Sequence, residues 1–194
     1  MAITYPLDMP TASFPEVEMR AISATAYDQS PFTFAGTSYE YPGQAWQADI
    51  TLPPDLRDDA AEEWVTFLLS LNGRAKTFLM GDPLRSSPRG TATSATVTGT
   101  TGSGTLSVTM TGTILRGDYI QLGSASSATL HKVLQTQDGN GNLEIWPNLR
   151  RDVTAESATL DNPRGLFRLA SNETAWTLRE AQLYGIAFSA MEAI

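Results

Sequence analysis

The chain has 194 residues, of which 41% are apolar and 18% charged, with a formal net charge of -8 and no cysteine. This length allows one or two domains that fold without staples, and the lack of cysteine excludes a disulfide framework and thiol catalysis. The net negative charge disfavours nucleic-acid binding, which needs clustered Lys and Arg. The low share of charged residues indicates that neighbouring molecules cover part of the surface.

The first ten residues, MAITYPLDMP, lack the basic and long apolar regions of a secretory signal. No apolar run approaches the ~20 residues that span a bilayer. We therefore expect synthesis and folding in a cytoplasm, and no membrane insertion.

The first fifty residues are predicted to be β. Residues 16–22 alternate between apolar and polar side chains, and residues 46–52 (WQADITL) do so most regularly. Residues 31–41 (PFTFAGTSYEY) are typical of a hairpin. In that hairpin Phe32 and Phe34 would face Tyr39 and Tyr41 across an Ala-Gly-Thr-Ser turn.

Residues 60–83, AAEEWVTFLLSLNGRAKTFLMGDP, predict a helix, a turn and a short strand. Asp58 and Asp59 are N-cap candidates for this helix, and Asn72-Gly73 supplies the left-handed residue that ends it. The helix carries one apolar stripe and no catalytic pattern, so we expect it to pack on a sheet. The residues expected to brace the sheet are Trp64, Leu68 and Leu71.

Composition changes after this unit. Residues 91–113 are almost wholly Thr, Ser, Gly and Ala, and three more strands are predicted over the following stretch up to Pro147. The tetrapeptides SPRG at 87–90 and NPRG at 162–165 bracket this block. We therefore predict an inserted all-β domain at 88–163, a small barrel or sandwich, within a discontinuous domain formed by 1–87 and 164–194.

No motif predicts an enzyme or a cofactor site, so no catalytic, cofactor-binding or metal-binding residue is assigned. His131 stands alone, without the partners that zinc requires. In DGNGNLE at 138–144, side chains with oxygen atoms occur at alternate positions, as in some calcium-binding loops. Asp-Gly and Asn-Gly are also common hairpin turns. A glycan hydrolase needs two catalytic carboxylates that meet in a cleft. The sequence does not exclude Asp82, Asp118 or Asp161 from this role, but no pattern identifies them.

Trp146 is the most suggestive residue of the inserted block. An exposed Trp on a β scaffold can stack on a sugar ring, whereas a buried Trp fills the core of the barrel. We favour the buried, core-filling position for Trp146. Arg150 and Arg151 follow it and could pair with acidic groups of another subunit, or remain solvated. These three residues are the candidates for a glycan or partner contact.

The ordered set WQADITLPP, the helix unit above, GDYIQLG, GNLEIWPNLR and NPRGLFRLA resembles the distal tail proteins of long-tailed bacteriophages. The resemblance covers about residues 44–190. It implies a mainly β fold: a tail-tube-like β-sandwich with one α-helix, plus a second β domain that projects outward. In this chain the outward domain would be the insertion.

The resemblance also implies a structural role in the virion, at the tail tip. Such proteins form a sixfold ring between the tail tube and the central hub, so the expected partners are copies of this chain, the tail tube protein and the tail hub protein. Receptor-binding or other minor tail proteins are further candidate partners. DNA would be only a non-specific passenger through an acidic lumen. Two alternatives stay open: a carbohydrate-binding host-attachment module, and another minor tail protein.

Overall fold

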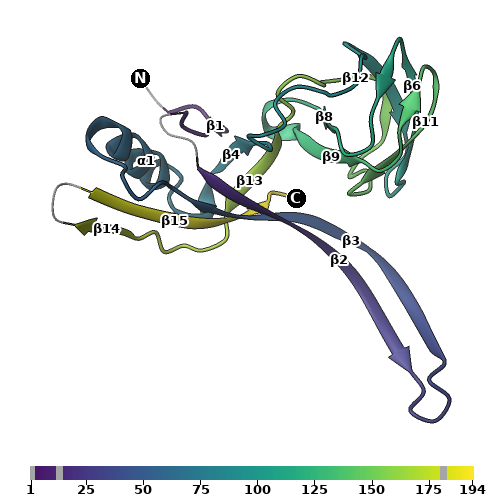
Figure 1. Ribbon diagram of the computed structural model, residues 1–194, viewed down its shortest axis with the longest axis horizontal. Coiled ribbons are helices and arrows are strands. Elements are labelled where there is room, and N and C mark those ends of the chain that lie inside the picture. The colour runs from purple at the N-terminus through teal and green to yellow at the C-terminus, as the bar shows by residue number, and fades with distance from the viewer. Residues whose placement is uncertain (1–2, 12–14, 180–182) are drawn as a thin grey trace.

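A computed structural model of the chain describes residues 3–11, 15–179 and 183–194. The fold is mainly β, with 50% strand and 10% helix, as the sequence predicted. Two sheet systems lie side by side, and a long two-stranded hairpin extends from one of them (Figure 1).

The first system, the body, is a seven-stranded sheet in the order β1-β4-β13-β15-β3-β2, with β14 paired to β15. Among the described strand pairs of this sheet, only the short β1–β4 pair is parallel. Its strands are β1 (Leu7–Asp8), β2 (Glu16–Gln29), β3 (Gly36–Thr51), β4 (Thr77–Met80), β13 (Gly165–Leu169), β14 (Trp176–Arg179) and β15 (Leu183–Glu192).

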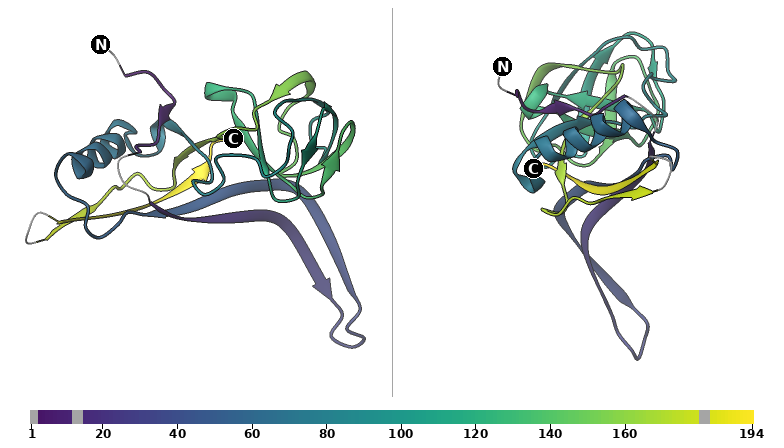
Figure 2. Two further views of the ribbon diagram at one scale, coloured as in Figure 1. Left: turned by 45° about the horizontal axis from the view of Figure 1, so that its top comes forward. Right: turned by 90° about the vertical axis from the view of Figure 1, so that its left-hand side faces the viewer.

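Helix α1 (Asp58–Ser70) covers one face of this sheet, as predicted (Figure 2). Trp64, Leu68 and Leu71 are at most 1% exposed and belong to the same core cluster as the sheet residues. Asn72 adopts the left-handed conformation just after the helix and leads into the short 3₁₀ turn η1 (Gly73–Ala75). The N-cap prediction is wrong: Arg57 holds that position, and Asp58 and Asp59 lie in the first turn, where acidic charge favours the helix dipole.

The second system, the module, forms residues 95–159 into a nearly closed antiparallel barrel in the strand order β12-β5-β6-β11-β9-β8. Reciprocal backbone hydrogen bonds between Gln121 and Thr159 join the two ends. The module has its own apolar core, which includes Leu106, Ile120 and Leu143. Its strands are β5 (Ala95–Gly99), β6 (Thr105–Met110), β8 (Tyr119–Leu122), β9 (Thr129–Val133), β11 (Gly141–Trp146) and β12 (Val153–Ala158), with a small pair of β7 (Thr113–Ile114) and β10 (Gln137–Asp138), and the 3₁₀ turn η2 (Ala125–Ser127).

The chain leaves the body after β4 and returns at β13, which pairs directly with β4 from Gly165↔Met80 to Arg168↔Thr77. The two crossings therefore lie side by side. Gly81 allows this approach, because a Cβ there would lie 2.2 Å from the carbonyl oxygen of Pro163.

The predicted hairpin at 31–41 has the wrong boundaries. The strands are much longer, and the turn lies at Ser30–Ala35, so Phe32 and Phe34 sit in the turn rather than opposite Tyr39 and Tyr41. Ala26 is the residue that pairs with Tyr39.

Candidate assembly interface

The hairpin of β2 and β3 extends well beyond the body, and we call its outer part, residues 23–44, the arm. Figures 1 and 2 show that it bends away from the sheet and passes below the module into open space. The register shifts between Ser23 and Thr25, and such a bulge bends a strand pair locally. Along β2 every residue from Arg20 to Gln29 is exposed.

The tip of the arm is an ordered turn. Ser30 N–H donates to the Ala35 carbonyl at 2.9 Å, and Phe34 N–H donates to the Ser30 carbonyl at 2.9 Å. Gln29 Nε2 donates to the Phe34 carbonyl at 2.9 Å. Phe34 adopts φ +56°, an uncommon conformation for a bulky residue. These bonds hold two aromatic side chains outward, since Phe32 is 91% exposed and Phe34 is 74% exposed.

The two strands of the arm carry exposed tyrosines, one of which packs against a glycine. Tyr27 lies across Gly36 so closely that a Cβ on Gly36 would be 2.1 Å from the tyrosine oxygen. An aromatic ring over a glycine is a device that stabilises an edge hairpin. Tyr39 and Tyr41 are also more than half exposed.

Such a surface is incomplete in isolation. A two-stranded hairpin is marginally stable in water without a further strand or layer, and clustered exposed aromatics mark interaction sites. No Lys or Arg occurs between Arg20 and Arg57. The arm carries two carboxylates, Asp28 and Glu40, and neither forms an ion pair with a described residue.

The body sheet also presents a free edge and an uncovered face. β2 is the terminal strand of the sheet, so its outer backbone groups lack a strand partner among the described residues. On the face opposite α1, Arg20 pairs with Asp49 at 2.6 Å and with Glu18 at 3.1 Å. These carboxylates raise the pKa of Arg20. The uncovered face therefore carries both signs of charge rather than a purely acidic surface.

The module is fixed to the body by an aromatic junction around Trp46, which is 4% exposed. The Trp46 ring stands edge-on to Trp146 with 4.4 Å between centroids, and its Nε1 donates to the Leu130 carbonyl at 2.9 Å. Tyr119 adds a third ring at 6.1 Å. Trp146 is thus half-buried between body and module.

A buried ion pair completes this junction. Arg150 Nη2 lies 2.9 Å from Glu192 Oε2, with side-chain exposures of 19% and 5%. The same carboxylate oxygen accepts a hydrogen bond from the backbone N–H of Trp46 at 3.1 Å, and Arg150 also donates to the Gln44 carbonyl. Module, β3 and β15 are therefore linked through one carboxylate.

His131 is fully buried beside this junction. Its Nδ1 donates to the Pro147 carbonyl at 2.7 Å, which leaves Nε2 to accept the Thr129 hydroxyl at 2.9 Å. Burial is the main cause that lowers the pKa of His131 to about 4, with smaller contributions from Arg150 and Arg151. The histidine is neutral at pH 7 and acts as a hydrogen-bonded core residue of the junction.

The structure separates the three candidate contact residues. Trp146 and Arg150 belong to the junction, whereas Arg151 lies on the module and pairs with Glu156 at 2.7 Å. That hydrogen bond lowers the pKa of Glu156. Trp146 borders a cleft of about 460 Å³ between module and arm, lined also by Tyr41 and Asn148. A glycan contact at Trp146 stays a prediction.

The other residues considered for chemistry have structural partners. Asp118 accepts hydrogen bonds from the backbone of Arg89, Gly90 and Leu115 and pairs with the Arg89 side chain at 3.0 Å. In the segment 138–144, for which the sequence left calcium binding as an alternative to a hairpin turn, Asn140 accepts the Met110 N–H and Glu144 accepts the Thr105 hydroxyl. Within the described ranges, no helix is long and apolar enough to cross a bilayer.

Comparison with protein-family models finds no match for this chain, and comparison with curated proteins finds none either.

Proposed function

We propose that this chain is a structural protein of a bacteriophage tail, a distal tail protein whose copies form a ring between the tail tube and the central hub. The observation that carries this proposal is the arm: an ordered, aromatic-tipped hairpin with no partner among the described residues of its own chain. The sequence resemblance is the reason for proposing a phage tail protein. The exposed arm and the free β2 edge are the reason for proposing contacts with other subunits.

The free β2 edge supports lateral assembly. An exposed edge strand invites pairing with another chain unless it is covered, and strand addition across copies would extend the sheet. Because the arm and the opposite edge of the sheet are different surfaces, contacts between them are head-to-tail. Such heterologous contacts close into rings when the rotation permits.

The junction supports a passive, load-transmitting role for the module. Buried aromatic and ionic contacts tie the module to β3 and β15, so the module would keep a fixed orientation on the ring. A hexamer is the copy number that the resemblance implies. In the assembled tail, the tube protein and the hub protein would contact opposite faces of the ring, and DNA would pass through without a specific site.

Two measurements test this proposal. Mass measurement of the purified chain over a range of concentrations should show one closed oligomer, and electron microscopy of tails with labelled antibody should place the chain at the tail tip. A chain that is monomeric in solution and also absent from purified tails would contradict the proposal.

A further inference from the structure

The cleft that Trp146 borders lies at the bulge of the arm. At this bulge Ala24 alone stands opposite residues 41–43 of the neighbouring strand. A bulge of this kind re-aims side chains, and Tyr41, which is 58% exposed, lines the cleft. Trp146 and Asn148 line it from the module. Arm and module therefore form two walls of one cleft.

Contacts between the arm and the module hold these walls in place. Gln44 Oε1 accepts a hydrogen bond from the backbone N–H of Asn148 at 2.7 Å, and the Gln44 carbonyl accepts one from Arg150. Trp146 is fixed by its edge-on contact with Trp46. The cleft is therefore preorganised, which reduces the cost of ordering its walls around a ligand.

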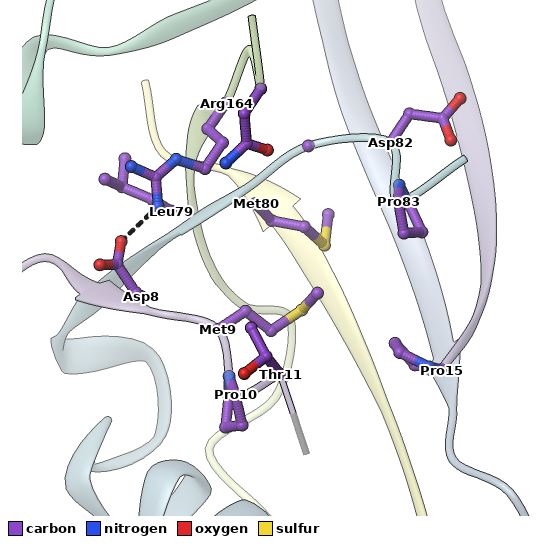
Figure 3. A pocket seen from close by; sticks show the side chains of 12 residues that line it. Asp8, Met9, Pro10, Thr11, Pro15, Leu79, Met80, Asp82, Pro83 and Arg164 are labelled. Carbon is purple, nitrogen blue, oxygen red and sulfur yellow. Dashed lines mark hydrogen bonds and ion pairs between the residues drawn. The ribbon is translucent and has the colours of Figure 1, made fainter. Parts of the chain in front are cut away.

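Polar groups in the cleft are without partners in the described part of the chain. The Tyr41 hydroxyl, the Asn148 side-chain amide and the Glu40 carboxylate line it and form no hydrogen bond or ion pair with a described residue. A second hollow, of about 330 Å³, differs in this respect, because Asp8 and Arg164 in its lining pair with each other at 2.5 Å (Figure 3). The donors and acceptors of the cleft are available to a ligand.

This lining suits a neutral sugar. The aromatic side chains of Trp146 and Tyr41 can pack on the apolar C–H face of a pyranose ring, while amide, hydroxyl and carboxylate groups bind its hydroxyl groups. No Lys, Arg or His is among the described residues that line the cleft, so a phosphate or a sugar carboxylate would find no cation to pair with. The volume of about 460 Å³ falls within the range of about 300–1,000 Å³ that small-ligand sites occupy.

We propose that the cleft between arm and module binds a neutral pyranose sugar, with Trp146 and Tyr41 against its ring and with Asn148 and Glu40 on its hydroxyl groups. This inference goes beyond the proposed ring and does not rest on it, because one chain supplies every residue that lines the cleft. A chain that fails to assemble into a ring would still carry the site.

Titration of the native chain with sugars, followed by tryptophan fluorescence, tests this site. The probes are the methyl glycosides of glucose, galactose, mannose and N-acetylglucosamine, and at least one should bind saturably at millimolar concentration. Tyr41→Ala should weaken that binding about tenfold. The matched control is Tyr39→Ala, because Tyr39 is 56% exposed on the same strand and does not line the cleft. This control should bind the sugar as the native chain does.

The charge of the ligand gives an independent readout. The uronic acid form of the best-bound probe carries a carboxylate at C6, so Glu40 should repel it, and it should bind about fivefold more weakly than the neutral sugar. In Glu40→Gln this difference should largely disappear.

Three results would overturn the proposal. The first is that no probe binds saturably. The second is an equal loss of binding in Tyr41→Ala and Tyr39→Ala, which would place the sugar outside the cleft. The third is tighter binding of the uronic acid than of the neutral sugar, or a preference for the neutral sugar that stays unchanged in Glu40→Gln.

Discussion

The Arg150–Glu192 pair allows a sharp prediction about what joins the module to the body. In Arg150→Met, the carboxylate of Glu192 keeps only the backbone N–H of Trp46 as a partner among the described residues, while its side chain is 5% exposed. Removing one member of a buried ion pair leaves an uncompensated charge and typically costs 3–5 kcal/mol. Arg150 Nε has no hydrogen-bond partner among the described residues, so the pair is imperfectly satisfied and we expect the lower value, about 3 kcal/mol.

Urea denaturation at pH 7, followed by tryptophan fluorescence, measures this loss. Arg151→Met is the matched control, because the Arg151–Glu156 pair is 41% and 24% exposed and should contribute less than about 1 kcal/mol. The double variant Arg150→Met/Glu192→Gln removes both charges and should be more stable than Arg150→Met alone. If Arg150→Met costs no more than Arg151→Met, the account of the junction is refuted.

Three further outcomes follow from the same geometry. Gly36→Ala should displace the Tyr27 ring and weaken oligomerisation, while the unfolding midpoint of the monomer changes little, as circular dichroism would show. Leu68→Ala, at 1% exposure, should lower the free energy of unfolding by about 2–5 kcal/mol in denaturant titration. The folded pKa of His131, about 4, lies below its ordinary 6.5, so its contribution is present above pH 6.5 and lost as pH falls towards 4. That contribution is on the order of 3 kcal/mol, and a His131→Gln variant should lack this part of the acid destabilisation. An unchanged pH profile in that variant would contradict the burial argument.

The helix and its turn could be predicted from the sequence because their signals are local. The apolar stripe has the helical period, and Asn72-Gly73 accommodates the left-handed backbone that ends the helix. The cap was misplaced because Asp58 and Asp59 favour both the cap and the first turn. Strand alternation likewise identified residues 46–52, whose buried face includes Trp46 and Ile50.

The arm was only partly predictable. A hairpin near residue 35 was expected, but alternation fades after Ile22 because neither side of the arm packs on a core. Burial creates the alternating pattern, so a strand pair that projects into solvent lacks it. The absence of Lys and Arg from 21 to 56 was the signal that could have marked it.

The junction could not be predicted because its partners are far apart in the chain. Trp46 meets Leu130 across a separation of 84 residues, and Arg150 meets Glu192 across 42. The sequence placed Trp146 on a strand but did not decide whether its side chain is buried or exposed. Only the fold shows that Trp46 packs against it.

The central claim is that the arm joins copies of this chain, and one measurement tests it most directly: the solution mass of the native chain against that of Phe32→Ser/Phe34→Ser. Both side chains are exposed at the tip, so the variant should stay folded and keep the native circular-dichroism spectrum. The account predicts a closed oligomer for the native chain and a monomer for the variant at the same concentration. An equal oligomer mass for the two proteins would contradict it.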